Sequence, residues 1–240
     1  SEINYRYTWY RNGVEFLDGD SAMIPAGSTE RYDVWRVVVT PSDGVSEGPT
    51  AEKEILVYNS PPEVASVTLT PDDADTTQDL VCQPIDVSDW DGGSPTVSLA
   101  WFVDGEVVSE TTAFLDHDLT TRGQEVYCEV TPTDDVEAGT TIRSNVVTIA
   151  NSAPTLTTAF INPDSVRAGD NPRCEWPDSS FIDPDGDADA STVTWSVNGV
   201  LSTEGPVADG YYVRGDILTC TVTPSDGVAD GETVSVSVEV

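Results

Sequence analysis

The stretch Thr194-Trp195-Ser196-Val197-Asn198-Gly199 occurs, with variation, three times in this chain. The other two copies are Trp9-Tyr10-Arg11-Asn12-Gly13 and Trp101-Phe102-Val103-Asp104-Gly105. The tryptophans are separated by 92 residues (101 − 9) and by 94 residues (195 − 101). Each copy is typical of a strand that runs into an Asn-Gly or Asp-Gly hairpin, because both central residues of that turn need positive φ.

This recurrence predicts three related repeats, over residues 1–58, 59–150 and 151–240, of which the first lacks its front strands. Apolar and polar residues alternate around each tryptophan and again late in each repeat. Short strands in which apolar and polar residues alternate, with turn signals about every 8 to 12 residues, predict an all-β protein of tandem β-sandwich domains. We expect Trp9, Trp101 and Trp195 to lie in the cores.

Composition narrows the class of function. The chain has 240 residues and a formal net charge of −33, which excludes nucleic acid and anionic membranes as natural partners. It has no apolar run long enough for a transmembrane helix. His117 is the only histidine, and neither a Gly-x-Ser-x-Gly motif nor a phosphate-binding glycine loop is present. We therefore expect that the protein is not an enzyme and binds no organic cofactor. We also expect that the chain is a processed product or an excerpt of a longer protein.

The four cysteines predict disulfides and a compartment. Cys82 and Cys128 are 46 residues apart (128 − 82), as are Cys174 and Cys220 (220 − 174). Each pair brackets the tryptophan of one repeat. The first repeat lacks the front portion, where the first cysteine would lie, and it has Val37 at the position of the second cysteine. Cysteines that occur together or not at all indicate one disulfide in each complete repeat. Such a loop closure stabilises a domain by about 4 kcal/mol and implies an extracellular or cell-surface location.

The order Cys-Trp-Cys resembles the immunoglobulin-like fold, although Val126 and Leu218 stand where a tyrosine corner would be. Linkers Asn59-Ser60-Pro61-Pro62 and Asn151-Ser152-Ala153-Pro154 and a Thr-Pro-Ser-Asp-Gly turn make the chain similar to bacterial Ig-like, cadherin-like or PKD-like surface repeats. The resemblance implies a stalk, adhesin arm or filament subunit. Its implied partners are other surface proteins, glycans or copies of itself.

An acidic loop precedes the third tryptophan and reads Asp183-Pro184-Asp185-Gly186-Asp187-Ala188-Asp189. It resembles calcium loops of bacterial surface repeats, and calcium takes about six to eight oxygen ligands. We expect Asp183, Asp185, Asp187 and Asp189 to bind Ca²⁺, and also Asp89 and Asp91 in the second repeat, where Gly93 replaces Asp187. Asp134, Asp135, Asp226 and the linker asparagines would contribute if the loop lies near a junction. The alternative is a solvated acidic turn.

Two further alternatives concern binding. Trp90 lies in the acidic loop of the second repeat, where an exposed ring would stack on a sugar, as in a carbohydrate-binding accessory module of a secreted enzyme. The incomplete first repeat has an open edge that would accept a strand from a neighbouring subunit and so build a fibre. Arg214-Gly215-Asp216 aligns with Arg122-Gly123-Gln124, so we interpret Arg-Gly as a structural turn rather than an integrin motif.

Overall fold

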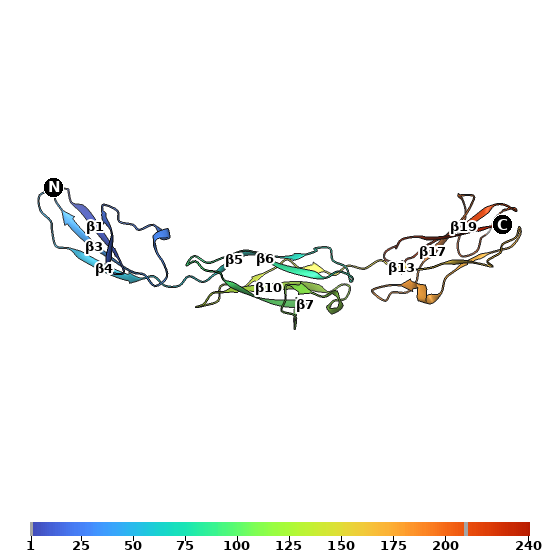
Figure 1. The fold of residues 1–240 in the computed structure, drawn as a ribbon, viewed down its shortest axis with the longest axis horizontal. Coiled ribbons are helices and arrows are strands. Elements are labelled where there is room, and N and C mark those ends of the chain that lie inside the picture. Colours follow the sequence, from blue (N-terminus) through green and yellow to red (C-terminus); the bar gives the residue numbers. More distant parts are fainter. Residues whose placement is uncertain (1, 209–210) are drawn as a thin grey trace. The chain divides into compact units, whose positions relative to one another are not determined.

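The computed structural model describes residues 2–208 and 211–240 (Figure 1). Its regular structure consists of β-strands and three short 3-10 helices: η1 (Ala26–Ser28), η2 (His117–Leu119) and η3 (Asp178–Ser180). These described residues form no α-helix, and therefore none that could cross a membrane. The predicted all-β class is confirmed.

The chain divides into two compact units. The first comprises residues 1–67, 84–99 and 129–143, and the second comprises residues 68–83, 100–128 and 144–240. Residues of the predicted second repeat belong to both units, so the domain bounds 1–58, 59–150 and 151–240 stay a prediction.

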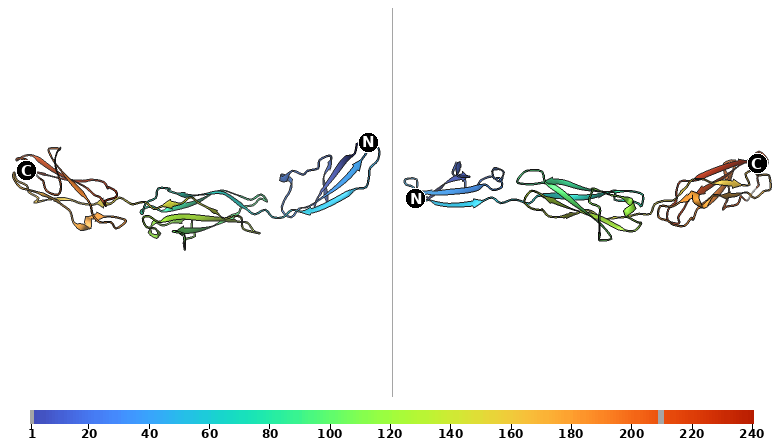
Figure 2. Two further views of the ribbon diagram at one scale, coloured as in Figure 1. Left: turned by 180° about the vertical axis from the view of Figure 1, so that it is seen from behind. Right: turned by 60° about the horizontal axis from the view of Figure 1, so that its bottom comes forward.

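Residues 2–58, which belong to the first unit, form one four-stranded antiparallel sheet. Its order is β2 (Val14–Gly19), β1 (Asn4–Arg11), β3 (Val34–Ser42) and β4 (Ala51–Leu56). Trp35 is its most buried apolar side chain, and its ring meets that of Phe16 edge to face at 4.9 Å between centroids. Among the described residues up to 58, no second sheet covers this one (Figure 2). Trp9 is accordingly only half-buried.

The middle of the chain has two sheets. One has the order β5 (Glu63–Thr70), β6 (Leu80–Ser88) and β9 (Phe114–Leu115). The other has the order β11 (Ile142–Arg143), β10 (Glu125–Thr133), β7 (Thr96–Val103) and β8 (Glu106–Val108), with β12 (Val147–Thr148) also paired to β10. Cys82 on β6 is bonded to Cys128 on β10, with their Cα atoms 6.2 Å apart. The disulfide therefore links the two sheets, as in an Ig-like sandwich.

Residues 151–240 repeat this plan. A four-stranded sheet has the order β18 (Val200–Glu204), β17 (Thr192–Val197), β19 (Ile217–Thr223) and β20 (Val234–Glu239). The pairs β13 (Thr155–Leu156) with β16 (Phe181–Ile182) and β14 (Phe160–Asn162) with β15 (Arg173–Glu175) form the rest. The Cys174–Cys220 disulfide joins β15 to β19, which confirms the second predicted bridge. Trp195 is 1 % exposed in this core, and Trp101 is 0 % exposed in the preceding one.

The predicted hairpin turns have a second use. Asn12 and Gly13 adopt φ values of 50° and 81°, and the other two copies adopt nearly the same angles. In each copy the Asn or Asp side chain also accepts a hydrogen bond from the strand that pairs next: Val34 N to Asn12 and Ile217 N to Asn198 at 2.9 Å, and Glu125 N to Asp104 at 3.0 Å. The turn residue thus ties the tryptophan strand to the late strand.

Candidate functional site

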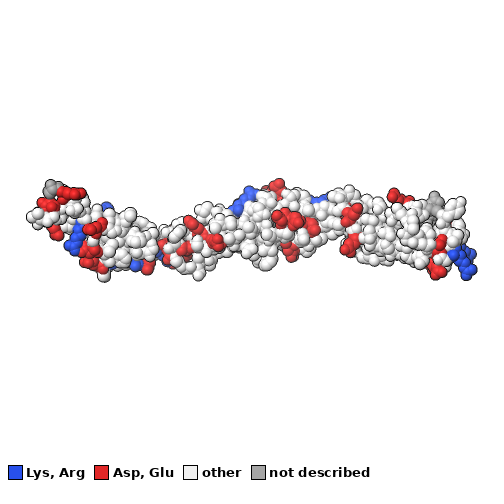
Figure 3. Space-filling model, turned by 90° about the horizontal axis from the view of Figure 1, so that it is seen from above, with Lys and Arg blue, Asp and Glu red and all other residues white. Residues whose placement is uncertain are grey.

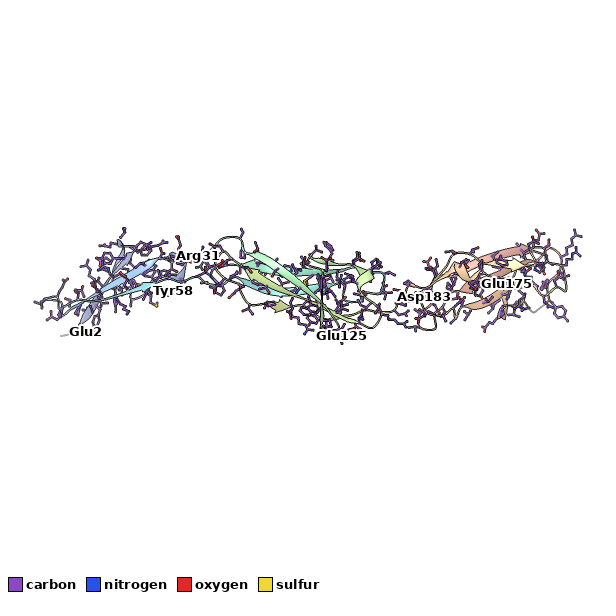
Figure 4. All side chains as sticks on the ribbon, turned by 90° about the horizontal axis from the view of Figure 1, so that it is seen from below. Glu2, Arg31, Tyr58, Glu125, Glu175 and Asp183 are labelled. Carbon is purple, nitrogen blue, oxygen red and sulfur yellow. A yellow bond between two sulfur atoms is a disulfide. The ribbon has the colours of Figure 1, made fainter. Side chains whose placement is uncertain are left out.

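Two linkers, residues 59–62 and 151–154, each lie against a turn that belongs to the following repeat. We name residues 59–62 with the turn 131–139 the first junction, and residues 151–154 with the turn 223–231 the second junction. All residues of the first junction belong to the first unit, and those of the second junction to the second unit. Figure 4 labels Arg31 and Tyr58 beside the first junction and Asp183 beside the second.

In the first junction, the side chain of Asn59 connects one guanidinium to two carboxylates. Its carbonyl oxygen accepts a hydrogen bond from Arg31 Nη1 at 2.7 Å. Its amide nitrogen donates to Asp134 Oδ2 at 3.0 Å and to Glu137 Oε1 at 2.8 Å. Since an amide has one accepting and one donating end, asparagine can connect a guanidinium to a carboxylate where a charged residue could not.

The second junction repeats these contacts. Asn151 accepts a hydrogen bond from Arg122 Nη1 and donates to Asp226 Oδ2 at 2.8 Å. Alanine stands at position 229, which corresponds to Glu137, so the second acceptor is missing here. The Arg–Asn–Asp series is common to both junctions.

The serine of each linker is held through its backbone. Ser60 N donates to Asp91 Oδ2 at 2.5 Å, and Ser152 N donates to Asp185 Oδ2 at 2.7 Å. Asp91 and Asp185 are the second aspartates of the two acidic loops, which the sequence suggested as calcium ligands. One oxygen of each is therefore an acceptor for the linker.

The linker proline approaches a glycine very closely. A Cβ atom added to Gly139 would lie 1.8 Å from the carbonyl oxygen of Pro62, and one added to Gly231 would lie 1.9 Å from that of Pro154. Carbon and oxygen cannot approach so closely, so only glycine fits at positions 139 and 231. This explains the glycine seven residues after the turn proline in both copies.

The turn that receives the linker is held by its own aspartate. Asp226 Oδ1 accepts hydrogen bonds from the backbone N–H groups of Val228 and Ala229, each at 2.6 Å. The Ala229 N–H, followed by Asn151, lowers the pKa of Asp226 to about 2. The pKa of Asp134 is lowered in the same way, first by the N–H of Glu137. Hydrogen bonds to the charged form keep both carboxylates ionised.

The two junctions differ in the carboxylate that pairs with the arginine. Arg31 binds Asp135 of the turn, with Nη1 2.8 Å from Oδ1, whereas Arg122 binds Asp187 of the acidic loop. The positions are exchanged: Gly227 stands in the second turn where the first has Asp135, and Gly93 stands in the first loop where the second has Asp187. Each arginine has one such carboxylate.

The predicted metal ligands are only partly brought together. Asp183 Oδ1 accepts the backbone N–H groups of Asp185 and Asp187, at 2.9 and 3.0 Å. Asp183 Oδ2 and Asp185 Oδ1 are buried and have no hydrogen-bond partner. Within residues 2–208 and 211–240 these are the only buried carboxylate oxygens in that condition. In the other loop, Asp89 Oδ1 accepts the N–H of Asp91 at 2.8 Å, and no orphaned oxygen results.

Asp189 has a different role from the other three aspartates. Its Oδ2 accepts from Trp176 Nε1, and its Oδ1 from Ser191 N, both at 2.8 Å. These contacts anchor the end of the loop.

In the described part of the chain, three side chains of the types that ligate metals converge elsewhere, at Asp79, Asp116 and His117. Asp79 Oδ1 receives hydrogen bonds from the backbone N of His117 at 2.9 Å and from its Nδ1 at 2.8 Å, and this contact raises the pKa of His117. Sequence reasoning missed this cluster, because Asp79 lies 38 residues from His117 (117 − 79) and the sequence contains no spacing that connects them. The contact fixes the 3-10 turn η2 against the start of β6.

The described surface carries acidic side chains along the whole visible face, with few Lys and Arg among them (Figure 3). Trp90 is 82 % exposed. Arg214, which aligns with Arg122, is exposed, and within the described residues it has no ion pair.

No protein-family model matches the chain, and no curated protein matches it. Among solved structures, the FN1–FN3 domains of chicken CNTN1 align with 99 % of this chain and 89 % of theirs, at 8 % identity and a TM-score of 0.33. A Ca²⁺-stabilized adhesin with which an Antarctic bacterium binds ice aligns with 98 % of this chain at 16 % identity and a TM-score of 0.36. This chain covers 64 % of that adhesin chain. At scores this low, neither match bears on the chemistry of the junctions.

Proposed function

We propose that this chain is a non-catalytic structural and interaction segment of a secreted bacterial surface protein, such as a stalk, an adhesin arm or a filament subunit. The observation that supports this most is the recurrence of the same linker contacts at two junctions. The same network of Arg, Asn and Asp, built once around each short proline-containing linker, would limit the motion of that linker, as a stalk or an adhesin arm requires. The two disulfides favour an extracellular location.

The energetics suit this role. Each hydrogen bond of a junction contributes about 1 kcal/mol net, and exposed ion pairs contribute less. No single contact would restrain a linker, but each linker has three: the asparagine side chain, the serine N–H and the proline carbonyl. All three lie within one four-residue stretch of the chain. Proline also limits the number of conformations that the free linker could adopt.

Limited proteolysis at the linkers tests the proposal. We expect residues 59–62 and 151–154 to resist a broad-specificity protease while the domains stay folded. A variant with Gly-Ser-Gly-Ser in place of residues 151–154 should be cleaved there at a far higher rate, with the first linker serving as internal control. Equal cleavage of the wild-type and Gly-Ser linkers would refute the proposed role.

We extend the proposal to calcium at the loop of residues 183–189. Asp183 Oδ2 and Asp185 Oδ1 support it, because buried carboxylate oxygens without a donor carry a free-energy cost that a cation would remove. Asp183 and Asp185 would hold the ion, and Asp187 could join them by exchanging its contact with Arg122. The proposal does not extend to the loop that contains Asp89 and Asp91, where no such oxygen is found among the described residues.

A second candidate function is carbohydrate binding by an accessory module, which the exposure of Trp90 favours. An indole ring this open to solvent can stack on a sugar face. Glycan-array binding that disappears in Trp90→Ala would support this function, and the absence of any glycan binding by the intact chain would exclude it.

A third candidate is assembly into a fibre by strand addition. It is favoured by the uncovered sheet of residues 2–58, with β2 and β4 at its edges. Polymerisation that increases with protein concentration would support it, whereas a purified chain that stays monomeric at all concentrations would exclude it.

A further inference from the structure

The outer face of the sheet β18-β17-β19-β20 consists largely of hydroxyl-bearing side chains. The apolar residues of β17, β19 and β20 pack against the core, and the residues between them point outward. The outward residues that carry hydroxyls are Thr192, Thr194, Ser196, Thr219, Thr221, Thr223, Ser235 and Ser237, which we name the hydroxyl face. In the strand register, charged residues occur only at its border, where Glu204 pairs with Thr194 and Glu239 pairs with Ile217.

The strand register places these hydroxyls in rows across the sheet. One row is Ser235, Thr221 and Thr194, and the next is Ser237, Thr219 and Ser196. Neighbouring strands are about 4.8 Å apart, and residues i and i+2 of one strand are about 6.8 Å apart. Two hydrogen bonds of 2.8 Å, between the hydroxyls of Thr219 and Ser237 and between those of Thr221 and Ser235, hold part of this array in place.

The fold does not require these hydroxyls, because the corresponding face of the second repeat lacks most of them. The places of Thr194, Ser196, Thr219, Thr221 and Ser235 are taken there by Ala100, Phe102, Tyr127, Glu129 and Arg143. In the sheet of residues 2–58, the corresponding positions include Arg36, Glu52 and Glu54. An uncharged face of hydroxyls is therefore a property of residues 151–240 among the three repeats.

A hollow of about 530 Å³ adjoins the hydroxyl face. Its lining includes Thr192 and Thr194 of that face, together with Trp176 and Glu204. The hydrogen bond of 2.8 Å from Trp176 Nε1 to Asp189 Oδ2 fixes the indole ring at this place. In the described chain, the hydroxyls of Thr192 and Thr194 have no hydrogen-bond partner. The hollow thus brings together an aromatic ring, a carboxylate and two available hydroxyls.

We propose that this hollow and the adjoining hydroxyl face bind an uncharged polysaccharide. The ring of Trp176 lies against the apolar face of one sugar, and Glu204 accepts hydrogen bonds from its hydroxyl groups. Thr192 and Thr194 donate to and accept from further sugar hydroxyls, since a hydroxyl has both capacities. The rows of the hydroxyl face continue the same contacts along the polysaccharide chain.

Charge decides which polymer fits. The net charge of −33 repels acidic polysaccharides. A basic polypeptide would place its cations on a face that has no carboxylate to pair with them, and burial of an unpaired charge is unfavourable. An uncharged polysaccharide leaves no charge unpaired. The inference names a ligand class for the interaction segment proposed above, at a site that does not include Trp90.

The test is native gel electrophoresis of the whole chain in gels that contain dextran, laminarin, amylose or hydroxyethyl cellulose. Alginate, whose sugars carry carboxylates, is the charged counterpart. At least one of the four uncharged polymers should retard the chain, and alginate should not. The dissociation constant from this retardation should rise about fivefold in Thr194→Val, the factor that corresponds to the loss of one neutral hydrogen bond. Trp176→Ala should raise it further.

The second repeat supplies a matched control. Thr192→Ala should weaken binding about fivefold, whereas Ser98→Ala, which removes the hydroxyl at the corresponding position of the second repeat, should leave it unchanged. Urea unfolding of each variant is measured first, because Trp176 packs partly against the core. If Trp176→Ala does not fold, the decision rests on Thr194→Val and Thr192→Ala, whose side chains lie on the outer face.

Several results would overturn the inference. These are no retardation by any of the four uncharged polymers, equal retardation by alginate, or an equal loss in Ser98→Ala. A loss in Trp90→Ala with no effect of Thr194→Val would also contradict it, because the sugar would then bind at Trp90. None of these results changes the protease resistance of the linkers, so the proposed structural role is judged separately.

Discussion

The two junctions use one frame and two different carboxylates. In both, an arginine binds the linker asparagine, which in turn binds the turn aspartate. The arginine's ion-pair partner is Asp135 of the turn in one junction and Asp187 of the acidic loop in the other. The junction thus requires one negative charge within reach of the arginine, and either of two backbone positions can supply it.

The exchange has consequences for the backbone and for the loop. The glycine that replaces the carboxylate takes positive φ in both places, 107° at Gly93 and 87° at Gly227. Only the loop that kept its third aspartate has buried oxygens without a partner, at Asp183 and Asp185. The second junction therefore differs from the first in its expected response to calcium, although its linker is held in the same way.

The largest effect should come from filling the glycine positions, which the junctions share. Gly139→Ala and Gly231→Ala should each lower the free energy of unfolding by about 2 kcal/mol, because the linker proline must move away from the new methyl group. Urea titration measures this. Gly48→Ala is the control, since its Cβ meets only the Pro41 ring; an equal loss in that variant would show that the linker carbonyl is not the cause.

Calcium should separate the two junctions. At about ten times the dissociation constant, the ion should stabilise the chain by about 1.4 kcal/mol. Asp185→Asn and Asp187→Asn should abolish the rise in melting temperature, whereas Asp91→Asn should preserve it. No shift with millimolar calcium, or the same response in all three variants, would rule out a site at residues 183–189.

Removal of the arginines should have a smaller effect and should be alike at both junctions. Arg31→Gln and Arg122→Gln should each cost about 0.5 to 1 kcal/mol in urea unfolding, because these ion pairs are partly exposed. Arg214→Gln should cost nothing, since within residues 2–208 and 211–240 that side chain has no ion pair. A similar loss in all three variants would mean that general charge, and not the junction, is responsible.

The smallest effect should be a dependence on acid pH. The pKa of Asp226 is about 2 in the folded chain, against an ordinary value of 3.8. A carboxyl group whose pKa is lowered by folding stabilises the folded state at every pH above its ordinary pKa. This stabilisation is lost as the pH falls from about 4 through about 2. The urea midpoint should therefore decrease over this range, and less steeply in Asp226→Asn. An unchanged slope in that variant would contradict the assignment.

Much of the fold was predictable, because its determinants are local. Alternation around Trp101 and Trp195 predicts the strands, and Asn-Gly or Asp-Gly predicts the hairpins. The paired presence of Cys174 and Cys220, and their common absence from the first repeat, predicts the disulfide. These features require only spacing and residue type.

The junctions were predictable only in part. The sequence named Asp134, Asp226 and the linker asparagines only as further calcium ligands, on the condition that the acidic loop lies near a junction, and it could not show which atoms pair. The role of Arg31 was hidden because Tyr32 follows it where the other copies have Arg-Gly. Tyr32 nevertheless adopts a φ of 68°, close to the 85° of Gly123, so the backbone is the same and the sequence pattern is lost.

The asparagine bridge also makes each junction sensitive to chemical ageing. Hydrolysis of the Asn151 side-chain amide would convert its donating end into a second carboxylate, placed against Asp226. The bridge would change from an attraction into a repulsion, with no change in the length of the chain. Asn59 faces the same reaction, and there two acidic groups, Asp134 and Glu137, would oppose the product. The lifetime of these two amides thus sets an upper limit on how long the junctions keep their structure.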